Sequence, residues 1–449
     1  MANKYFGTDG IRGRANVELT PTLCYRAGFA LACVLQKEEP NKPRVLIGRD
    51  TRLSGGMLQG ALTAGLCAAG ADVVHLGVLP TPAVAYLTVR DAEADAGIVL
   101  SASHNPFEDN GIKIFGGDGF KLTDEQEKEI ERLIDAPPPA SKVGAELGAL
   151  LDYAGGDPAE LYERHVADGA LCRLDGLRVL VDCANGAASR TAETILRLLG
   201  ADVRLMYAAP DGVNINTGCG STHLDALRKA VVDGRFPVGV AFDGDADRCL
   251  MVDETGAVID GDRMLGVLAG DMQRRGQLRG GVVGTILTNL GLKVYLEGLG
   301  VGLTAADVGD RYVLEEMRRG GHNLGGEQSG HVILSDFATT GDGQLTAVRM
   351  LGVLKQSGQP ASALHAGIEQ YPQVTINVEM PNDRKRLVAS LPEVERLRTD
   401  IAAAFQGKGR VVIRPSGTEP KVRVMVEGND GDKVRALARQ AADVIGGLR

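Results

Sequence analysis

Several ingredients are scarce in this 449-residue sequence, and each shortage excludes a class of function. Tryptophan is absent and aromatic residues make up only 4%, so little is available for stacking on the bases of single-stranded nucleic acid. Acidic residues outnumber basic residues by 58 to 49, which gives a net charge of −9, whereas nucleic-acid binders carry a basic surplus. We therefore expect no nucleic-acid partner.

Long apolar runs are also missing. No run approaches the roughly 18–20 residues that a membrane-spanning helix needs, and the opening MANKYFGTDGIRGR lacks the apolar centre of a secretion signal. We expect no membrane association and a cytoplasmic location. The seven cysteines form no CxxC pair, which disfavours a zinc centre or a disulfide framework and predicts free, mostly buried thiols.

Glycine, by contrast, is plentiful, with 60 of 449 residues, about twice the usual share of roughly 7%. Hydrophobic residues make up 44% and charged residues 24%, as in ordinary folded domains. At roughly 150 residues per domain, the length predicts about three domains. The glycine surplus indicates many tight loops, in which the backbone approaches something closely.

A strand–helix–strand pattern occurs three times, beginning at residues 44–50, 178–183 and 281–286. The first two copies share a junction, AAGADVVHL at 68–76 and LLGADVRLM at 198–206. Repeats of this length predict three related α/β domains with mainly parallel mixed sheets. The last 75 or so residues differ, because TINVEM, RVVIRP and KVRVMVEG alternate as in an antiparallel sheet. They predict a small C-terminal α+β domain.

Breaks in these patterns predict the domain boundaries. A proline-rich stretch lies at 136–141, and a helix restarts at Asp157-Pro158 with a cap and an N1 proline. Further joints are expected near 254–256 and at Tyr371-Pro372. We expect α/β domains at 1–155, 156–255 and 256–370, and the α+β domain at 371–449.

The first segment with chemical potential is SASHNP at 101–106, the serine loop, which directly follows the apolar strand 96–100. Open α/β sheets bind ligands at the carboxyl ends of their strands, and the Asn-Pro turn predicts an exposed Ser103. A polar surface turn is the simpler alternative. A serine hydrolase is disfavoured, because His104 adjoins Ser103 and no G-x-S-x-G motif occurs.

The second segment, DGDADR at 243–248, is the acidic loop, and it follows the apolar strand 237–242. Asp243, Asp245 and Asp247 can converge on one hard cation, and without a cation their mutual repulsion makes burial costly. A solvated acidic turn is the alternative. An EF-hand fails because Arg248 stands where that loop needs glycine and no helix precedes it. Three carboxylates leave coordination positions open, which suits Mg²⁺ shared with a phosphate.

Two later segments are suited to ligand binding. The EQSG loop, GGEQSGH at 325–331, places polar side chains between glycines, where they can meet a polyhydroxyl ligand, although such loops are common. The anion cradle, RPSGTEPKVR at 414–423, combines hydroxyls, a glycine and arginines, a composition that matches phosphate. It could also be an ordinary turn. Neither a Walker A motif nor a GxGxxG motif after a strand occurs, which disfavours nucleotides.

The four segments, in this order and spacing, resemble the α-D-phosphohexomutase family over essentially the whole chain. The resemblance implies four domains around a central cleft. The opening GTDGIRG and Gln328 are most similar to the phosphoglucosamine mutase branch, whereas the phosphomannomutase/phosphoglucomutase branch more often has Met at the Gln328 position and is the alternative. A non-catalytic sugar-phosphate-binding protein is the alternative of another class, but it would have lost the serine or the acidic triad.

The resemblance also implies the role of each residue. Ser103 is expected to carry a phosphoryl group, and one of its phosphate oxygens would join Asp243, Asp245 and Asp247 in binding Mg²⁺. Four residues are expected around the reacting groups, namely Arg12, Lys113, Arg248 and His331. Substrate binding is expected from His104, Asn105, Arg311, Glu327, Ser329, Arg414, Ser416, Gly417, Thr418 and Arg423.

The reaction implied is the interconversion of glucosamine 6-phosphate and glucosamine 1-phosphate through a 1,6-bisphosphate, a step toward UDP-N-acetylglucosamine and the cell wall. It would use one Mg²⁺ per chain, with glucosamine or glucose 1,6-bisphosphate as activator. The expected partners are small-molecule sugar phosphates and a second copy of the chain in a homodimer.

Overall fold

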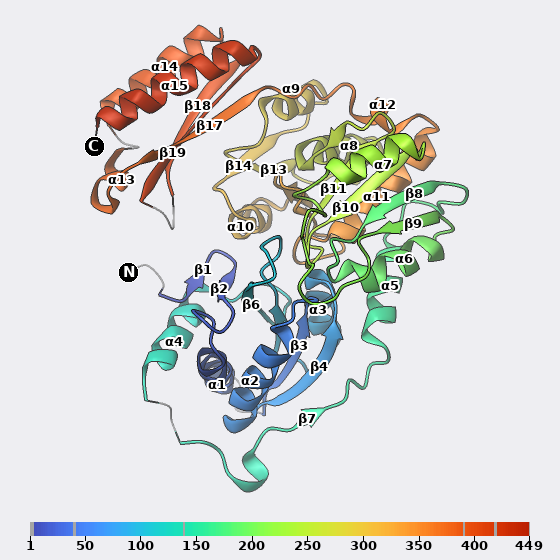
Figure 1. Ribbon diagram of the computed structural model, residues 1–449, viewed down its shortest axis with the longest axis vertical. Helices are drawn as coiled ribbons and strands as arrows, with labels where there is room; N and C mark the ends of the chain where they lie inside the picture. Colours follow the sequence, from blue (N-terminus) through green and yellow to red (C-terminus); the bar gives the residue numbers. More distant parts are fainter. Residues whose placement is uncertain (1–3, 39–41, 138–139, 389–390, 417–419, 449) are drawn as a thin grey trace.

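The structure, a computed structural model, describes residues 4–38, 42–137, 140–388, 391–416 and 420–448. In these residues the strands form four separate sheets, each with its own helices (Figure 1). The first and the fourth sheets lie toward opposite ends of the long axis (Figure 1). This is the expected architecture of three α/β domains followed by a small α+β domain.

Domain 1 contains a seven-stranded mixed sheet of order β1-β2-β6-β5-β3-β4-β7. Its strands are β1 (Phe6–Gly7), β2 (Gly10–Arg14), β3 (Arg44–Arg49), β4 (Asp72–Val78), β5 (Ala96–Leu100), β6 (Asp109–Gly116) and β7 (Leu150–Leu151). Its helices are α1 (Pro21–Glu38), α2 (Gly55–Ala68), α3 (Thr81–Arg90) and α4 (Asp124–Asp135). The expected capping box begins α4, since the Thr123 side chain accepts from the Gln126 N–H and the Gln126 side chain reaches back.

Domain 2 contains a five-stranded sheet of order β12-β11-β10-β8-β9, in which β9, β8 and β10 are parallel. Its elements are α5 (Pro158–Asp168), β8 (Arg178–Asp182), α6 (Ala188–Leu198), β9 (Asp202–Met206), α7 (Asp225–Asp233), β10 (Val238–Phe242), β11 (Cys249–Asp253) and β12 (Val258–Ile259). Asp157 caps α5 as expected, with Pro158 in its first turn. The short β12 lies past residue 255, and the expected domain boundaries stay predictions.

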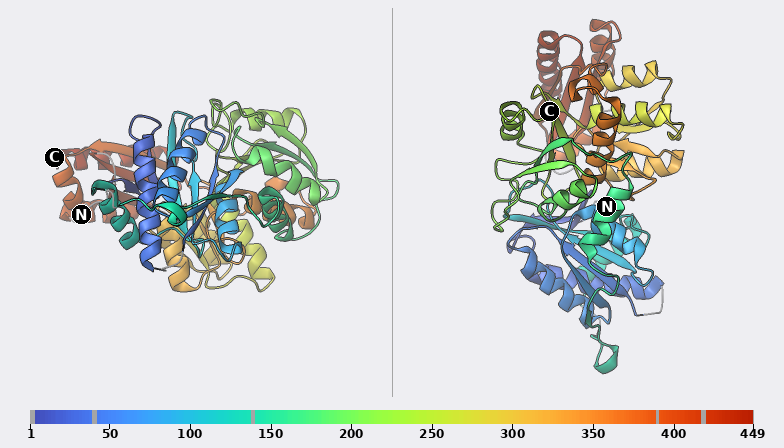
Figure 2. Two further views of the ribbon diagram at one scale, coloured as in Figure 1. Left: turned by 90° about the horizontal axis from the view of Figure 1, so that it is seen from below. Right: turned by 90° about the vertical axis from the view of Figure 1, so that its right-hand side faces the viewer.

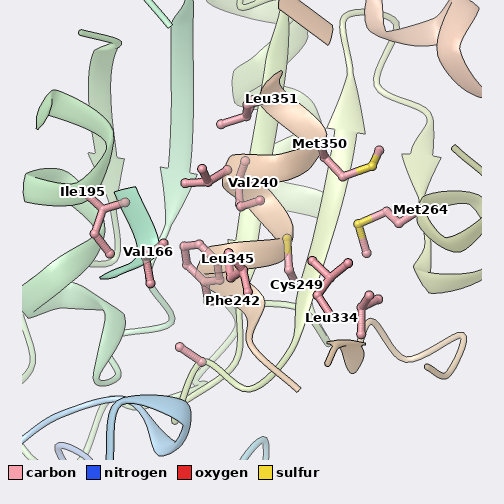
Figure 3. Packing of buried hydrophobic residues seen from close by; sticks show 14 of the residues in the cluster. Val166, Ile195, Val240, Phe242, Cys249, Met264, Leu334, Leu345, Met350 and Leu351 are labelled. Carbon is pink, nitrogen blue, oxygen red and sulfur yellow. The ribbon is translucent and has the colours of Figure 1, made fainter. Parts of the chain in front are cut away.

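Domain 3 contains a four-stranded sheet of order β14-β13-β15-β16. Its elements are α8 (Gly261–Arg274), β13 (Val282–Thr285), α9 (Leu290–Gly298), β14 (Leu303–Ala306), α10 (Asp310–Gly320), β15 (Leu324–Gly326), β16 (Val332–Leu334), α11 (Gly343–Ser357) and α12 (Ala361–His365). Helix α11 is buried along most of its length and packs against both domain 2 and domain 3 (Figure 3). It therefore joins the two domains through a shared core.

Domain 4 contains an antiparallel sheet of order β17-β19-β18. Its elements are β17 (Gln373–Glu379), α13 (Asn382–Val388), α14 (Pro392–Ala404), β18 (Gly409–Pro415), β19 (Lys421–Gly428) and α15 (Gly431–Gly447). Its helices pack on one side of the sheet, and the domain lies at the opposite end of the long axis from domain 1 (Figure 1, and the right view of Figure 2). Its apolar residues form a core cluster of their own.

Two expectations from composition concern the whole chain. All seven cysteines are free, and four of them are buried, as expected for structural thiols. Among the helices of the described residues, none combines the length and the apolar character that crossing a bilayer would require.

Candidate active site

The serine loop and the acidic loop meet at the junction of domains 1 and 2. The serine loop follows β5 and the acidic loop follows β10, and both strands are completely buried. Both are joined in parallel to neighbouring strands, so the two loops leave the carboxyl ends of their sheets, where such folds bind ligands. The left-handed backbone of Ser103 (φ 53°) and Ala246 (φ 54°) marks both loops as strained.

Ser103 is not exposed, contrary to the expectation from the Asn-Pro turn. Only 1% of it is accessible, because the acidic loop of domain 2 lies directly over it. The contact is so close that a Cβ on Gly244 would lie 2.6 Å from the Ser103 carbonyl oxygen. A turn that is polar within domain 1 is thus buried by domain packing, which local sequence does not report.

The three aspartates of the acidic loop form a compact cluster. Each has a carboxylate oxygen within 4.8 Å of the others, and Asp243 Oδ2 accepts a hydrogen bond of 2.6 Å from the Ser103 hydroxyl. The Oδ1 atoms of Asp245 and Asp247 are buried without a hydrogen-bond partner among the described residues. Buried acceptors of this kind require a positive partner, so the cluster fits a divalent cation with oxygen ligands.

Nearby charged groups set the cost of burying the three carboxylates together. Burial, Asp247 and Asp245 together raise the pKa of Asp243 well above its ordinary value. Lys113 offsets part of this repulsion, since its ammonium lies 2.8 Å from Asp245, 3.1 Å from Asp247 and 3.1 Å from Asp9. Lys113 is only 2% exposed. One buried cation among these carboxylates leaves excess negative charge, which a bound metal ion would neutralise.

Three more expected residues lie at this cluster. The Arg248 guanidinium is 3.9 Å from Asp247, and His331 Nδ1 is 3.8 Å from Asp247. His104 Nδ1 lies 3.2 Å from the Ser103 hydroxyl oxygen. Burial, followed by the charges of Arg248 and Arg12, lowers the pKa of His104 to about 4, so this imidazole is neutral at physiological pH. Arg12 itself is exposed and paired with Asp9.

The EQSG loop lies between β15 and β16 and presents one anchored and one unpartnered group. Glu327 Oε1 accepts from the Gly309 N–H at 3.1 Å, and its charge contributes to raising the pKa of Arg248. The Ser329 hydroxyl is buried with no hydrogen-bond partner among the described residues. Gln328 instead donates to Asp260 at 3.2 Å, beside the start of α8.

The anion cradle joins β18 and β19 in domain 4. Arg414 and Arg423 lie directly opposite each other in the antiparallel register, and Ser416 is buried beside Lys385, which donates to its carbonyl at 2.8 Å. Burial and the charge of Arg423 lower the pKa of Arg414, which Glu327 partly offsets. The cradle therefore carries concentrated positive charge within electrostatic reach of the EQSG loop. Gly417 and Thr418 lie outside the described residues.

Two side chains expected to bind the substrate, Arg311 and Asn105, contact other protein groups instead. The Arg311 guanidinium is 2.7 Å from Asp124 and 3.3 Å from Glu127, so it holds α10 against α4 of domain 1. It lines a cavity of about 270 Å³ between domains 1 and 3, which also reaches His331. Asn105 donates to Asp109 at 2.9 Å within its own domain. Neither side chain contacts the acidic cluster in this structure.

The sequence did not reveal three residues whose hydrogen bonds hold the acidic loop and the serine loop in place. Thr81 donates to Asp245 at 2.6 Å, Arg52 is buried beneath the serine loop, and Asn216 crosses to that loop from domain 2. One available signal was position, because Asp50 and Arg52 directly follow the buried strand β3, at the same edge of the sheet as the serine loop.

Comparison with known proteins finds the same four domains in the same order. Four family models described as phosphoglucomutase/phosphomannomutase match in order, as alpha/beta/alpha domain I at residues 3–139, domain II at 161–256, domain III at 260–371 and the C-terminal domain at 376–444. The chain is 48% identical to the phosphoglucosamine mutase of Shouchella clausii over 98% of each chain. It is 50% identical to that of Rhodococcus erythropolis over 99% of this chain and 100% of the relative.

Solved structures share the fold. A phosphoglucomutase/phosphomannomutase family protein from Burkholderia thailandensis superposes with a TM-score of 0.82 at 25% identity, over 98% of this chain and 97% of that one. The N-acetylphosphoglucosamine mutase of Aspergillus fumigatus, solved with GlcNAc-6P and magnesium, gives 0.72 at 19% identity, over 100% and 96%. With four domain models matched in order and relatives at this identity over full length, the chain belongs to the phosphoglucomutase/phosphomannomutase family.

Proposed function

We propose that this enzyme is a phosphoglucosamine mutase, which interconverts glucosamine 6-phosphate and glucosamine 1-phosphate through a phosphoserine and a 1,6-bisphosphate. The observation that carries the proposal is the 2.6 Å contact between the Ser103 hydroxyl and Asp243, inside a triad suited to a cation. Its substrate follows from curated phosphoglucosamine mutases that are 46–50% identical over almost the whole chain.

The reaction needs two phosphoryl transfers at one serine. In the first, the O–P bond of phospho-Ser103 breaks as the 1-hydroxyl oxygen of glucosamine 6-phosphate bonds to phosphorus, and the hydroxyl proton ends on the Ser103 oxygen. The bisphosphate then turns over, the Ser103 oxygen bonds to the phosphorus at position 6 as the P–O6 bond breaks, and the Ser103 proton passes to O6. Glucosamine 1-phosphate leaves and the phosphoserine is restored, so atoms and charges balance over the cycle.

Positioning and charge neutralisation dominate such transfers. Lys113 and Arg248 lie against the acidic cluster, where they would neutralise negative charge on the phosphoryl group during its transfer. Arg12 is linked to Lys113 because Asp9 pairs with both. His331 faces Asp247 and would hold a proton near the reacting oxygen. His104 is neutral and lies next to Ser103, so it would accept a hydrogen bond from a substrate hydroxyl without adding charge. Asn105, the next residue, would also contact the substrate.

Mg²⁺ fits the donor set, since Asp245 and Asp247 each keep an unpartnered buried oxygen. Asp243, Asp245 and Asp247 would hold one ion per chain, together with a phosphate oxygen on Ser103. When bound, the ion would neutralise charge on the transferring group. Its positive charge would offset the burial and the repulsion from Asp247 and Asp245 that together raise the pKa of Asp243.

The remaining residues would grip the sugar and its second phosphate. Glu327 and the unpartnered hydroxyl of Ser329 would bind sugar hydroxyl groups or the amine. The phosphate that is not being transferred would lie in the anion cradle, on Arg414, Ser416, Gly417, Thr418 and Arg423. Arg311 would join them only after leaving Asp124 and Glu127.

Three finer expectations belong to this proposal. A phosphomannomutase/phosphoglucomutase activity is the second candidate, and it keeps the same site with another sugar. Glucosamine or glucose 1,6-bisphosphate would act as activator by phosphorylating Ser103 in chains that have lost the group. The homodimer stays a prediction that sedimentation of the purified protein tests.

The decisive experiment measures turnover on the 6-phosphates of glucosamine, glucose and mannose side by side. We expect glucosamine 6-phosphate to have the highest kcat/KM. Ser103→Ala should abolish turnover on all three. The Ser101 hydroxyl instead donates to Asp50 at 2.6 Å, so peptide mass spectrometry of Ser101→Ala should still find phosphate on Ser103. Full activity in Ser103→Ala would refute the mechanism, and a preference for mannose or glucose phosphates would shift the substrate.

A further inference from the structure

Two carbonyl oxygens of the serine loop, those of Ser103 and Asn105, are each held by the same pair of donors. Arg52 Nη2 lies 2.9 Å from both oxygens. Asn216 Nδ2 lies 2.9 Å from the first and 3.0 Å from the second. A carbonyl oxygen has two lone pairs, so these four hydrogen bonds fill both oxygens. We call this arrangement the carbonyl clamp.

Arg52 supplies the half of the clamp that belongs to domain 1. Its side chain is completely buried and paired with Asp50 at 2.8 Å. It also donates to the carbonyls of Asp109, at 3.0 Å, and Pro106. A buried guanidinium is tolerated only when its donors and charge are satisfied, and here the backbone of the loop satisfies the donors. The loop and Arg52 therefore depend on each other.

Asn216 supplies the other half from domain 2. Its backbone is left-handed (φ 59°) and its N–H donates to the Ala184 carbonyl at 2.9 Å, which anchors it within that domain. The acidic loop is packed against it, since a Cβ on Gly244 would lie 2.9 Å from Asn216 Nδ2. One amide thus touches the serine loop while its own backbone belongs to the domain that carries Asp243, Asp245 and Asp247.

The conformation of Ser103 needs such support. Its left-handed backbone (φ 53°) is unfavourable for a residue other than glycine. The clamp fixes the Ser103 carbonyl and so restrains the backbone that carries the hydroxyl bonded to Asp243. A displacement of about 1 Å at reacting atoms costs on the order of a hundredfold in rate.

We infer that Asn216 is a positioning residue for phosphoryl transfer, which acts with Arg52 to hold Ser103 in register with the acidic loop across the boundary between domains 1 and 2. The inference rests on the proposed function, in which Ser103 is the phosphoryl carrier. Asn216 touches neither the sugar nor the phosphate in this scheme. Its loss should therefore lower the rate of transfer and leave substrate affinity in place.

The test is Asn216→Gly in the full-length enzyme, because glycine accepts the left-handed backbone and only the amide is removed. The matched control is Asn185→Gly. Asn185 is also left-handed (φ 49°) and is 7% exposed against 6% for Asn216. Its amide donates to the Asn214 carbonyl and accepts from the Ala209 N–H, both in domain 2.

We expect Asn216→Gly to lower kcat about 10- to 100-fold, with KM unchanged within about twofold. The single-turnover transfer from phospho-Ser103 to glucosamine 6-phosphate should slow by the same factor. Asn185→Gly should keep kcat within about threefold at a similar melting temperature. Arg52→Lys keeps the charge beside Asp50 but loses the planar fork, and it should add little to Asn216→Gly in a double variant if both side chains hold the same carbonyls.

Equal kcat in Asn216→Gly and Asn185→Gly would overturn the inference, as would a loss confined to KM. Arg52→Lys is informative only if it folds, and the Asn216 comparison stands without it. Wild type and Ser103→Ala are assayed in parallel. An inactive wild type, or an active Ser103→Ala, would mean that the proposed function itself is wrong, whereas failure of the inference leaves both results as expected.

Discussion

Domains 1–3 and domain 4 are held together in different ways. One continuous hydrophobic cluster runs through the first three domains and includes Val84, Val179 and Val282, with α11 packed between domains 2 and 3 (Figure 3). The apolar residues of domain 4 form a separate cluster, from Val378 to Ile445. The first three domains thus share one cluster, to which domain 1 adds a second cluster of its own, while the fourth domain contributes nothing to the shared cluster among the described residues and has only its own.

The two ends of the site follow this division. Ser103, Lys113 and the three aspartates are nearly inaccessible and are fixed by hydrogen bonds between domains 1 and 2. Arg414 and Arg423 are only half-buried on a sheet that belongs to domain 4. Under the proposed function, phosphoryl transfer would occur in this rigid frame, while the second phosphate would be gripped by a separate body, whose movement would let the bisphosphate turn over.

Breaking the rigid end should have the largest effect. Asp245→Asn removes one charge at nearly constant shape, and we expect kcat to fall about a thousandfold at ordinary Mg²⁺ concentrations because the metal site is weakened. Chelation should abolish turnover in the wild type, and added Mg²⁺ should restore it. The matched control is Asp233→Asn, an exposed aspartate in domain 2 that pairs with Lys229. Undiminished turnover of the wild type in excess chelator would contradict the metal site.

Weakening the moving end should have a smaller and different effect. Arg423→Ala would remove the proposed charged hydrogen bond to the phosphate that is not transferred, worth about 1.5–3 kcal/mol, or roughly ten- to a hundredfold in kcat/KM. Because that contact exists in both the ground state and the transition state, the loss should be mainly in KM. Steady-state kinetics and inhibition by inorganic phosphate, which should weaken in the variant, measure it.

A secondary effect of Arg423→Ala can be separated from the first. In the proposed cycle the cradle would also hold the bisphosphate during its turnover, so weaker binding would release it and leave dephosphorylated enzyme with a lower kcat. Added glucosamine 1,6-bisphosphate should restore kcat and leave the KM defect. If kcat alone fell, with KM and phosphate inhibition unchanged, the cradle would not be the phosphate site.

The same comparison separates what the sequence predicts from what it does not. The serine and acidic loops are predictable, because each follows an apolar strand and the carboxyl ends of parallel strands gather at one edge of a sheet. The repeats and the alternating C-terminal strands likewise predict the three α/β domains and the α+β domain. These are local patterns, which packing between domains does not alter.

What the sequence could not predict arises where domains meet. The burial of Ser103 comes from a loop 140 residues later in the chain, and the engagement of Arg311 with α4 depends on how domain 3 docks on domain 1. Asn216 carries no motif, since its role is the contact with the serine loop of domain 1. Side chains whose partners lie in another domain are invisible to periodicity and spacing.

A milder change at the junction of domains 3 and 4 should sharpen the comparison further. Glu427 is completely buried in domain 4, yet it accepts from the Leu290 N–H at 2.8 Å, at the beginning of α9 in domain 3. It also pairs with Arg410 at 2.8 Å. Glu427→Gln keeps the shape and removes the charge that favours a helix N-terminus.

We expect this variant to loosen domain 4, so that proteolysis near Tyr371-Pro372 becomes faster. Loss of the bisphosphate should also reduce kcat by about two- to fivefold. Added glucosamine 1,6-bisphosphate should restore kcat. Glu395→Gln, an exposed change on α14 of the same domain, is the control and should leave both readings unchanged. Unaltered proteolysis in Glu427→Gln would mean that domain 4 is not held in place by this contact.

The smallest expected effect on turnover is that of Asp262→Asn, which instead reports on stability at the same junction. Asp262 is buried in the first turn of α8, and its Oδ2 accepts from the Asn289 N–H at 2.8 Å. Burial, and next the charge of Asp260, raise its pKa to about 8, whereas an unfolded chain has an aspartate pKa of about 3.9.

Between those two values the unfolded chain releases its proton and the folded chain keeps it, so this group makes the fold less stable as pH rises from about 4 to 8. Asparagine cannot ionise and mimics the protonated carboxyl. Wild type and Asp262→Asn should therefore be closest in stability near pH 4, and the variant should gain on the wild type by up to about 1.4 kcal/mol for each pH unit between about 4 and 8. Melting curves at pH 5, 6, 7 and 8 measure the divergence, with Asp233→Asn as the exposed control. Curves for wild type and Asp262→Asn that stay parallel across this range would show that Asp262 is ionised in the fold, and the junction would then owe none of its pH dependence to this carboxyl.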